Sequence, residues 1–230
     1  MKYRYRKFVK AFTLVELLVV ISIIALLMAI LLPSLAKARL QAKIVVVNFE
    51  LRQVSLALGL YYEDNKEYPP TMADCGSGML KDHMSQLPKL LADNGYLPAK
   101  SRREAMDTIM EDPFNPGHTY KYNSCGEIIL DRDKIEKDIN AALWVPDKFP
   151  AQSSLNENDG KWHNDTRTSP VLWVVYSLGP NFDQDEFLKK CNRRFYPVPK
   201  EMWYSPKEKK GLLVRLRLDN DREIGSFEGY

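Results

Sequence analysis

The stretch KAFTLVELLVVISIIALLMAILLPSLAKAR, residues 10–39, contains an apolar run of 21 residues, 12–32, with a single charge at Glu16. At ~1.5 Å per residue, a helix of this length spans about 32 Å, close to the ~30 Å hydrocarbon core of a bilayer. Five cations and no acid precede the run, so the positive-inside rule favours a cytoplasmic N-terminus. The stretch therefore predicts a membrane-spanning helix.

The basic character of the chain comes from its first eleven residues. The whole chain has 33 Lys and Arg against 30 Asp and Glu, and without the five leader cations 28 basic residues face 30 acidic ones. Basic residues do gather at 189–196, together with Phe195 and Tyr196, and at 207–210, and phosphate contacts need such charge. Because the remainder is balanced, we interpret them as solvated surface and expect no nucleic-acid partner.

Catalytic and metal-binding motifs are missing from the sequence. The three cysteines, Cys75, Cys125 and Cys191, form no C-x-x-C pair, and the three histidines lie far apart. Outside the cytoplasm, one disulfide and one leftover thiol would be the simplest arrangement, with the pairing left open. No P-loop, nucleophile motif or H-E-x-x-H occurs, so we do not predict an enzyme.

A carboxylate inside an apolar run needs an explanation, because a charge within a membrane span is costly and usually marks a function. An ordinary signal peptide, cleaved near the Ser34–Ala36 triplet, would accommodate the run, although typical apolar regions of signal peptides have 7–15 residues. An uncleaved signal anchor would accommodate it as well. Neither alternative gives Glu16 a role.

The string AFTLVELLVVISIIALL, beginning at Ala11, resembles the prepilin (class III) signal of type IV pilins and type II secretion pseudopilins. The resemblance implies that a prepilin peptidase cuts between Ala11 and Phe12 and N-methylates Phe12. It also implies that Glu16 of one subunit pairs with the Phe12 amine of the next, since a pair in low dielectric is better than either charge alone. Pro33 matches the helix-kinking proline of many members. The family usually has Gly where this chain has Ala11.

An apolar stripe at three- and four-residue steps continues after Pro33 and predicts an amphipathic extension of the helix over 34–62. Pro33 lacks an amide donor, so we expect it to bend or loosen the helix. The Asp64-Asn65 turn and two prolines should end the helix. We expect the half of the stripe nearest the C-terminus to pack into the core of the head. The stripe consists of Leu35, Ala38, Ala42, Val45, Phe49, Leu56 and Leu60.

The remaining residues, 63–230, should form a globular head with both helices and strands. The apolar, β-branched run 171–176 and the alternating run 212–220 predict strands, the second of them antiparallel. We further expect a short helix within 84–98, stopped by Asn94-Gly95, and a turn-rich approach to a strand at 111–123. The spacing of Ile135, Ile139 and Leu143 predicts another helix. Residues 154–169 should form a polar loop, which is a candidate for disorder. The predicted fold class is α+β, pilin-like, with a long N-terminal helix and a small antiparallel sheet.

Three short strings in the head, YYEDNKEYPP, DPFNP and SLGPN, resemble pseudopilin sequences. They favour a type II secretion pseudopilin over a type IV pilus subunit, a minor pilin included. Asn181, Asp183 and Asp185 follow SLGPN and offer oxygen ligands of the kind that calcium prefers, and the resemblance adds that major pseudopilins bind calcium after this element. The alternative interpretation of Asn181–Asp185 is a solvated acidic turn.

Together these inferences predict a cytoplasmic leader (1–11), a transmembrane and assembly helix (12–33), its amphipathic continuation (34–62) and a periplasmic head (63–230). The expected function is a structural subunit of a filament that leaves the bacterial inner membrane. The expected partners are the prepilin peptidase, other pilin or pseudopilin subunits and the secretion or pilus assembly machinery. A soluble periplasmic binding protein or enzyme with an ordinary signal peptide is the competing class.

Overall fold

The computed structural model describes residues 12–73, 84–98, 110–130, 134–151, 155, 157–190 and 197–229. The leader with Ala11, and also Cys75 and Cys191, lie outside these residues. The chain divides into two units, residues 1–42 and 43–230, and the helix α1 (Leu14–Asn65) contributes to both.

In the first unit, α1 continues without a break through Pro33. The apolar side chains of residues 14–32 are all exposed. Among the described residues, α1 is the one helix that is long and apolar enough to cross a membrane. It ends at Asn65, three residues beyond the predicted end.

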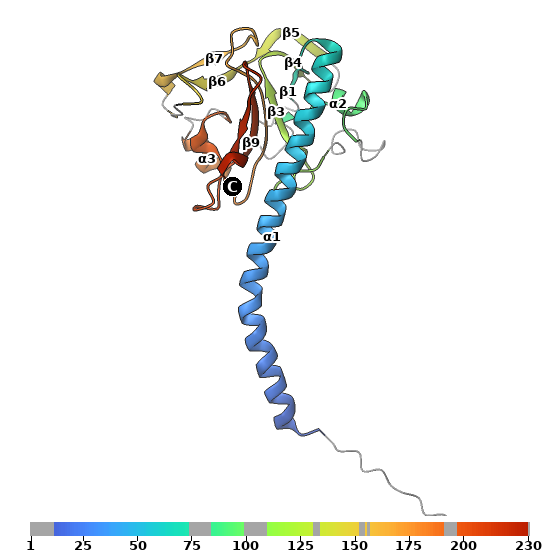
Figure 1. Cartoon of the computed structure of the whole chain (residues 1–230), viewed down its shortest axis with the longest axis vertical. Coiled ribbons are helices and arrows are strands. Elements are labelled where there is room, and N and C mark those ends of the chain that lie inside the picture. Colours follow the sequence, from blue (N-terminus) through green and yellow to red (C-terminus); the bar gives the residue numbers. More distant parts are fainter. Residues whose placement is uncertain are drawn as a thin grey trace, which may run out of the picture. The chain divides into compact units, whose positions relative to one another are not determined.

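In the second unit, the head is built on an eight-stranded sheet of order β10-β9-β8-β3-β2-β1-β4-β5 (Figure 1). All neighbours are antiparallel except β1 and β4, which confirms the α+β class. The strands are β1 (Thr71–Ala73), β2 (Met84–Gln86), β3 (Lys121–Ser124), β4 (Gly126–Leu130), β5 (Lys134–Ala141), β8 (Val171–Ser177), β9 (Leu213–Leu218) and β10 (Glu223–Gly225).

A smaller antiparallel sheet of β6 (Leu143–Pro146) and β7 (Gly160–His163) adds to the core, in which Trp144 and Val145 are buried. The other elements are short. They are α2 (Leu90–Asp93), α3 (Gln184–Lys190) and the 3-10 turns η1 (Glu157–Asp159), η2 (Lys200–Met202) and η3 (Ser226–Gly229).

The C-terminal half of α1 is held on the head by apolar burial and by tyrosine hydroxyls. The hydroxyl of Tyr120 donates to Glu50 on α1, and that of Tyr122 donates at 2.8 Å to the carbonyl of Pro69, in the segment that follows the helix. Figure 1 shows this half of α1 beside the strands. Its buried apolar side chains recur at three- and four-residue steps, as expected for one helix face. They include Ile44, Val47, Leu51, Val54 and Leu58.

The predicted stripe does not pack into the core, and this expectation was wrong. Val45, Phe49, Leu56 and Leu60 are 66%, 61%, 62% and 58% exposed. This part of α1 is apolar on two faces, and periodicity alone cannot tell which face meets the sheet. We call these four residues the outward stripe.

Other expectations have mixed outcomes. The strands predicted at 171–176 and 212–220 are confirmed as β8 and β9, and β9 pairs antiparallel with β8 and β10. The strand predicted after the turns of 111–123 is confirmed as β3. The polar loop at 154–169 contains η1 and β7.

Two predicted helices differ from the structure. The helix spaced by Ile135, Ile139 and Leu143 is wrong, because these residues form β5 and β6. Pairing of β5 with β4 overrides the local spacing. The helix within 84–98 is limited to the four residues of α2 after a strand, while Gly95, at φ +79°, lies at its end as predicted.

The strings DPFNP and SLGPN meet through one buried carboxylate, that of Asp112. Its Oδ1 accepts hydrogen bonds from the amide of Phe114 at 2.9 Å and the hydroxyl of Ser177 at 2.7 Å, and its Oδ2 accepts one from the amide of Leu178 at 3.1 Å. Burial raises the pKa of Asp112, and these hydrogen bonds oppose that rise. One side chain therefore joins two loops whose bonded residues, Asp112 and Ser177, are 65 positions apart in sequence.

We predict that Asp112→Ala lowers the free energy of unfolding of the head by about 3 kcal/mol, because three donors lose their acceptor at a buried site. Chemical denaturation of the full chain in detergent measures this loss. Asp147→Ala, which removes an exposed carboxylate, is the matched control and should change the value by less than ~0.5 kcal/mol. Equal effects of the two substitutions would contradict the role of Asp112.

The two faces of α1 predict opposite responses to the same substitution. Leu58→Ala should cost about 2–5 kcal/mol of stability, since Leu58 is fully buried. Leu56→Ala, two residues away and 62% exposed, should change the stability of the monomeric chain in detergent by less than ~0.5 kcal/mol. A comparable loss in both variants would mean that the outward stripe is covered within the monomer.

Candidate assembly site

The first turn of α1 is fixed by a reciprocal set of hydrogen bonds between Thr13 and Glu16. The amide and the hydroxyl of Thr13 donate to Glu16 Oε2 at 2.9 and 2.8 Å, and the amide of Glu16 donates to Thr13 Oγ1 at 3.2 Å. This is the capping box that the pattern Thr-x-x-Glu forms at a helix start. The T-L-V-E string carries the signal for this cap, although the cap is not among the predictions above.

The capping box leaves half of the carboxylate available. All the bonds that Glu16 accepts within the described residues go to Oε2. A carboxylate has acceptor sites on both oxygens, so Oε1 can receive an ammonium group while Oε2 still caps the helix. The helix dipole also favours a negative charge in this first turn.

The other predicted processing and assembly residues lie along the same unit. Phe12 precedes the helix and is 70% exposed, while Ala11 lies outside the described residues. Pro33 lies within α1, 17 residues beyond Glu16, or about 25 Å along a helix axis. The structure therefore joins Glu16 to Thr13, the residue that follows Phe12, and leaves Pro33 separate.

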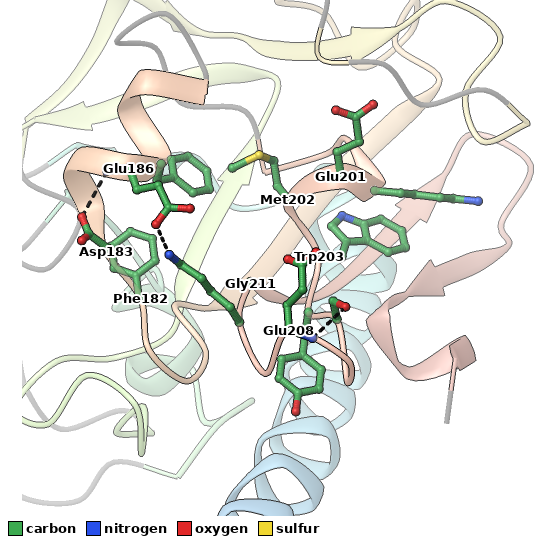
Figure 2. Close-up of a pocket in the computed structure, with 13 residues that line it drawn as sticks. Phe182, Asp183, Glu186, Glu201, Met202, Trp203, Glu208 and Gly211 are labelled. Atoms are coloured by element: carbon green, nitrogen blue, oxygen red, sulfur yellow. Dashed lines mark hydrogen bonds and ion pairs between the residues drawn. The ribbon is translucent and has the colours of Figure 1, made fainter.

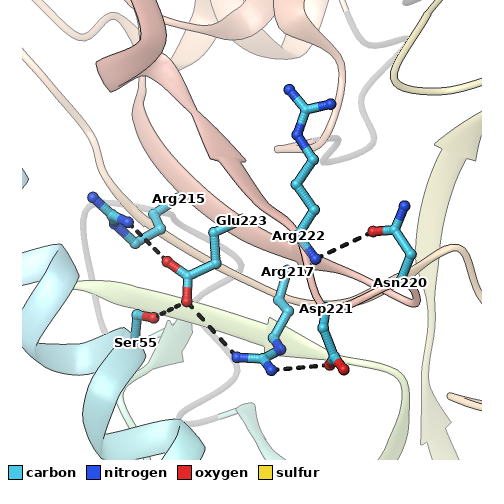
Figure 3. Close-up of polar contacts among 7 residues, drawn as sticks. All are labelled: Ser55, Arg215, Arg217, Asn220, Asp221, Arg222 and Glu223. Carbon is cyan, nitrogen blue, oxygen red and sulfur yellow. Dashed lines mark hydrogen bonds and ion pairs between the residues drawn. The ribbon is translucent and has the colours of Figure 1, made fainter.

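A polar cluster fixes the rotation of α1 on the head, and with it the direction of the outward stripe (Figure 3). Glu223 on β10 accepts from the hydroxyl of Ser55 on α1 and pairs with Arg215 at 2.8 Å. Arg217 lies 3.9 Å from Glu223 and pairs with Asp221 at 2.9 Å. Because Ser55 is buried against the head, the side chain of the next residue, Leu56 of the outward stripe, is held facing away from the head.

Asp183, one of the three predicted calcium ligands, lines a cavity of about 280 Å³ that is bordered by α3 and η2 (Figure 2). Asp183 Oδ1 caps α3 by accepting from the amides of Asp185 and Glu186. The side-chain amide of Asn181 donates to the carbonyl of Lys209 at 3.1 Å.

Two of the three predicted calcium ligands thus have structural roles. In the part of the chain that the structure describes, no group of three His, Cys, Asp or Glu side chains could hold a metal. Calcium binding by Asn181, Asp183 and Asp185 therefore stays a prediction.

Cys125 is a buried free thiol whose Sγ donates to the carbonyl of His163 at 3.1 Å. Burial raises the pKa of this thiol, so it lacks the thiolate character of a reactive cysteine. The predicted disulfide stays a prediction because the other two cysteines lie outside the described residues.

Comparison with known proteins identifies the N-terminal segment. Residues 6–32 match the prokaryotic N-terminal methylation motif. The chain is 33% identical over 86 residues to the type II secretion system core protein G of Pseudomonas aeruginosa, covering 37% of this chain and 61% of that protein. It is 44% identical over 64 residues to the type IV wide pilus major component PilA4 of Thermus thermophilus, covering 28% and 49%.

The chain thus spans about half to three-fifths of the length of these curated relatives. No solved structure matches it. Both relatives are named as components of assemblies, a secretion system and a pilus, and neither name describes an enzyme. The chain thus carries the methylation motif on an apolar helix long enough to cross a membrane, and over part of its length it is similar to a type II secretion core protein and to a type IV pilus component.

Proposed function

We propose that this chain is a type II secretion pseudopilin. Prepilin peptidase cuts it between Ala11 and Phe12 and methylates Phe12. The head then lies in the periplasm, and the helix leaves the inner membrane to pack into a filament. Glu16 of one subunit receives the Phe12 amine of the next.

The observation that carries this proposal is the geometry of Glu16. The cap of the first turn uses only one carboxylate oxygen of Glu16, Oε2. The other oxygen, Oε1, stays available for the ammonium group of a neighbouring subunit. Glu16 lies in the first turn of α1, four residues after Phe12, where cleavage would create the amine. In a low dielectric, an uncompensated ammonium or carboxylate is costly, and a pair relieves both costs. The charge pair would thereby set the axial register between copies.

The outward stripe supports the same proposal. Exposed apolar side chains continue from residues 14–32 of α1 to Val45, Phe49, Leu56 and Leu60 on the head. An uncovered apolar surface of this kind marks an interaction site. In a filament, neighbouring helices would cover this surface. A helix that served only as a membrane anchor would not need exposed apolar residues beyond its membrane-spanning part.

A type IV pilus subunit is the second candidate, and the 44% identity to the Thermus pilus component favours it. The match to core protein G covers more of this chain, and the DPFNP and SLGPN strings support the pseudopilin. A soluble protein with an ordinary signal peptide would discard residues 12–33. It would leave the Thr13–Glu16 capping box and the outward stripe without a role.

We predict that the mature chain purified from its native membrane begins at N-methylated Phe12. Mass spectrometry of the intact protein and of its N-terminal peptide measures both the cut and the methyl group. Ala11→Gly, which introduces the residue that the family usually has before the cut, should be processed at least as completely. A mature N-terminus near Lys37 would instead mean ordinary secretion and would contradict the proposal.

We predict that Glu16→Ala abolishes filament assembly while the head stays folded, because it removes the acceptor for the Phe12 amine. Thr13→Ala is the matched control: it removes a capping hydroxyl but keeps the carboxylate, and it should assemble. Electron microscopy of sheared filaments, with thermal unfolding of the head as the folding check, measures both. Normal assembly of Glu16→Ala, or equal loss in both variants, would show that Glu16 acts only as a cap.

A further inference from the structure

A groove of about 750 Å³ lies at the C-terminal end of α1. Tyr62 and Tyr68 form part of its wall and stack with their ring centroids 4.8 Å apart. The end of β9 and the start of β4 supply other parts of the lining. The groove is therefore assembled from segments far apart in sequence, all within residues 43–230.

The charges of the groove do not balance. Its three cations already have acidic partners: Lys66 pairs with Glu63, Arg167 with Asp165, and Arg217 with Asp221. Three further carboxylates in the lining, those of Glu67, Glu127 and Asp219, are exposed. Within the described residues they make no side-chain hydrogen bond or ion pair. The groove thus offers unpaired negative charge beside an aromatic wall, which suits cationic side chains.

The same head presents a complementary element, the turn of residues 205–210. It is closed by hydrogen bonds from the amide of Ser205 to the carbonyl of Lys210 and from the amide of Lys209 to the carbonyl of Ser205. Lys207 and Lys209 on this turn are exposed and have no acidic partner among the described residues. Lys210, in contrast, pairs with Glu186. We call this element the lysine turn.

The groove and the lysine turn lie at opposite ends of the same pair of strands. The lysine turn shortly precedes β9, beside the end of β8, since Ser177 is opposite Leu213. Asp219 of the groove lies at the other end, where Val171 is opposite Leu218. At ~3.3 Å per residue, the six residues of β9 separate the two by about 20 Å.

The direction of α1 follows the same axis. Lys43 donates to the carbonyl of Pro113 at 3.3 Å, next to Asp112, which binds the Ser177 end of β8. Further along the helix, Tyr62 lines the groove. The helix therefore runs from the lysine-turn end of the head to the groove end.

We infer that the groove receives the lysine turn of another copy of this chain, displaced along the α1 direction. Complementary patches at opposite ends of one subunit make a head-to-tail contact, which propagates as an open filament when the rotation does not close a ring. The inference rests on the proposed function, because copies aligned by their helices present groove and turn to one another. It adds a contact between heads to the packing of helices.

The test is a charge swap in the full chain, expressed in its native membrane with its assembly machinery. Lys207→Glu with Lys209→Glu should lower the amount of sheared, pelletable filament about fivefold or more, and Glu67→Lys with Asp219→Lys should do the same. The combination of all four substitutions should restore the filament, because the two patches then match again with reversed signs.

The matched control reverses two exposed lysines outside both patches, Lys148→Glu with Lys189→Glu, and should leave the amount of filament unchanged. Unfolding of each variant in detergent confirms that its head is folded. Two outcomes would overturn the inference and leave the proposed function intact. One is an amount of filament at the control level in both reversed pairs. The other is a fourfold variant whose head is folded but which does not recover the filament. Absence of filament from the unmodified chain would overturn both.

Discussion

The C-terminal half of α1 has to satisfy two apolar environments at once, and the arrangement of the head follows from this constraint. One face buries Ile44, Val47 and Leu58 against the sheet, and this burial supplies the main adhesion between helix and head. The opposite face leaves Phe49 and Leu56 uncovered. A helix with apolar residues on both faces could rotate to bury either one, so the protein needs a polar device that selects the rotation.

Two polar contacts between α1 and the strands provide that selection. The buried hydroxyl of Ser55 donates to Glu223 on β10, and the hydroxyl of Tyr120 donates to Glu50 on the helix. Glu50 directly precedes the buried Leu51 along α1, so both contacts lie beside the face that meets the sheet. Because a rotated helix would separate these groups and leave the buried ones without partners, the contacts fix which apolar face stays outside.

The N-terminal segment uses a single carboxylate in two ways. Oε2 of Glu16 holds the first turn of α1 through Thr13, while Oε1 stays open. The helix start is thereby ordered before any partner arrives, so a partner's amine would meet an acceptor that is already positioned. The capping box and the proposed charge pair are compatible because they use different oxygens of the same group.

Local composition and periodicity were enough to predict the N-terminal segment, the long helix and the strands β8 and β9, because each of these depends on residues close together in the chain. Packing settled which face of α1 is buried, since both faces are apolar. Pairing with β4 also turned the helix-like spacing of Ile135 and Ile139 into β5, because it outweighs a weak local preference. The contact between Asp112 and Ser177 was likewise out of reach of sequence patterns, because a hydrogen bond between residues so far apart along the chain exists only once the sheet has brought their loops together.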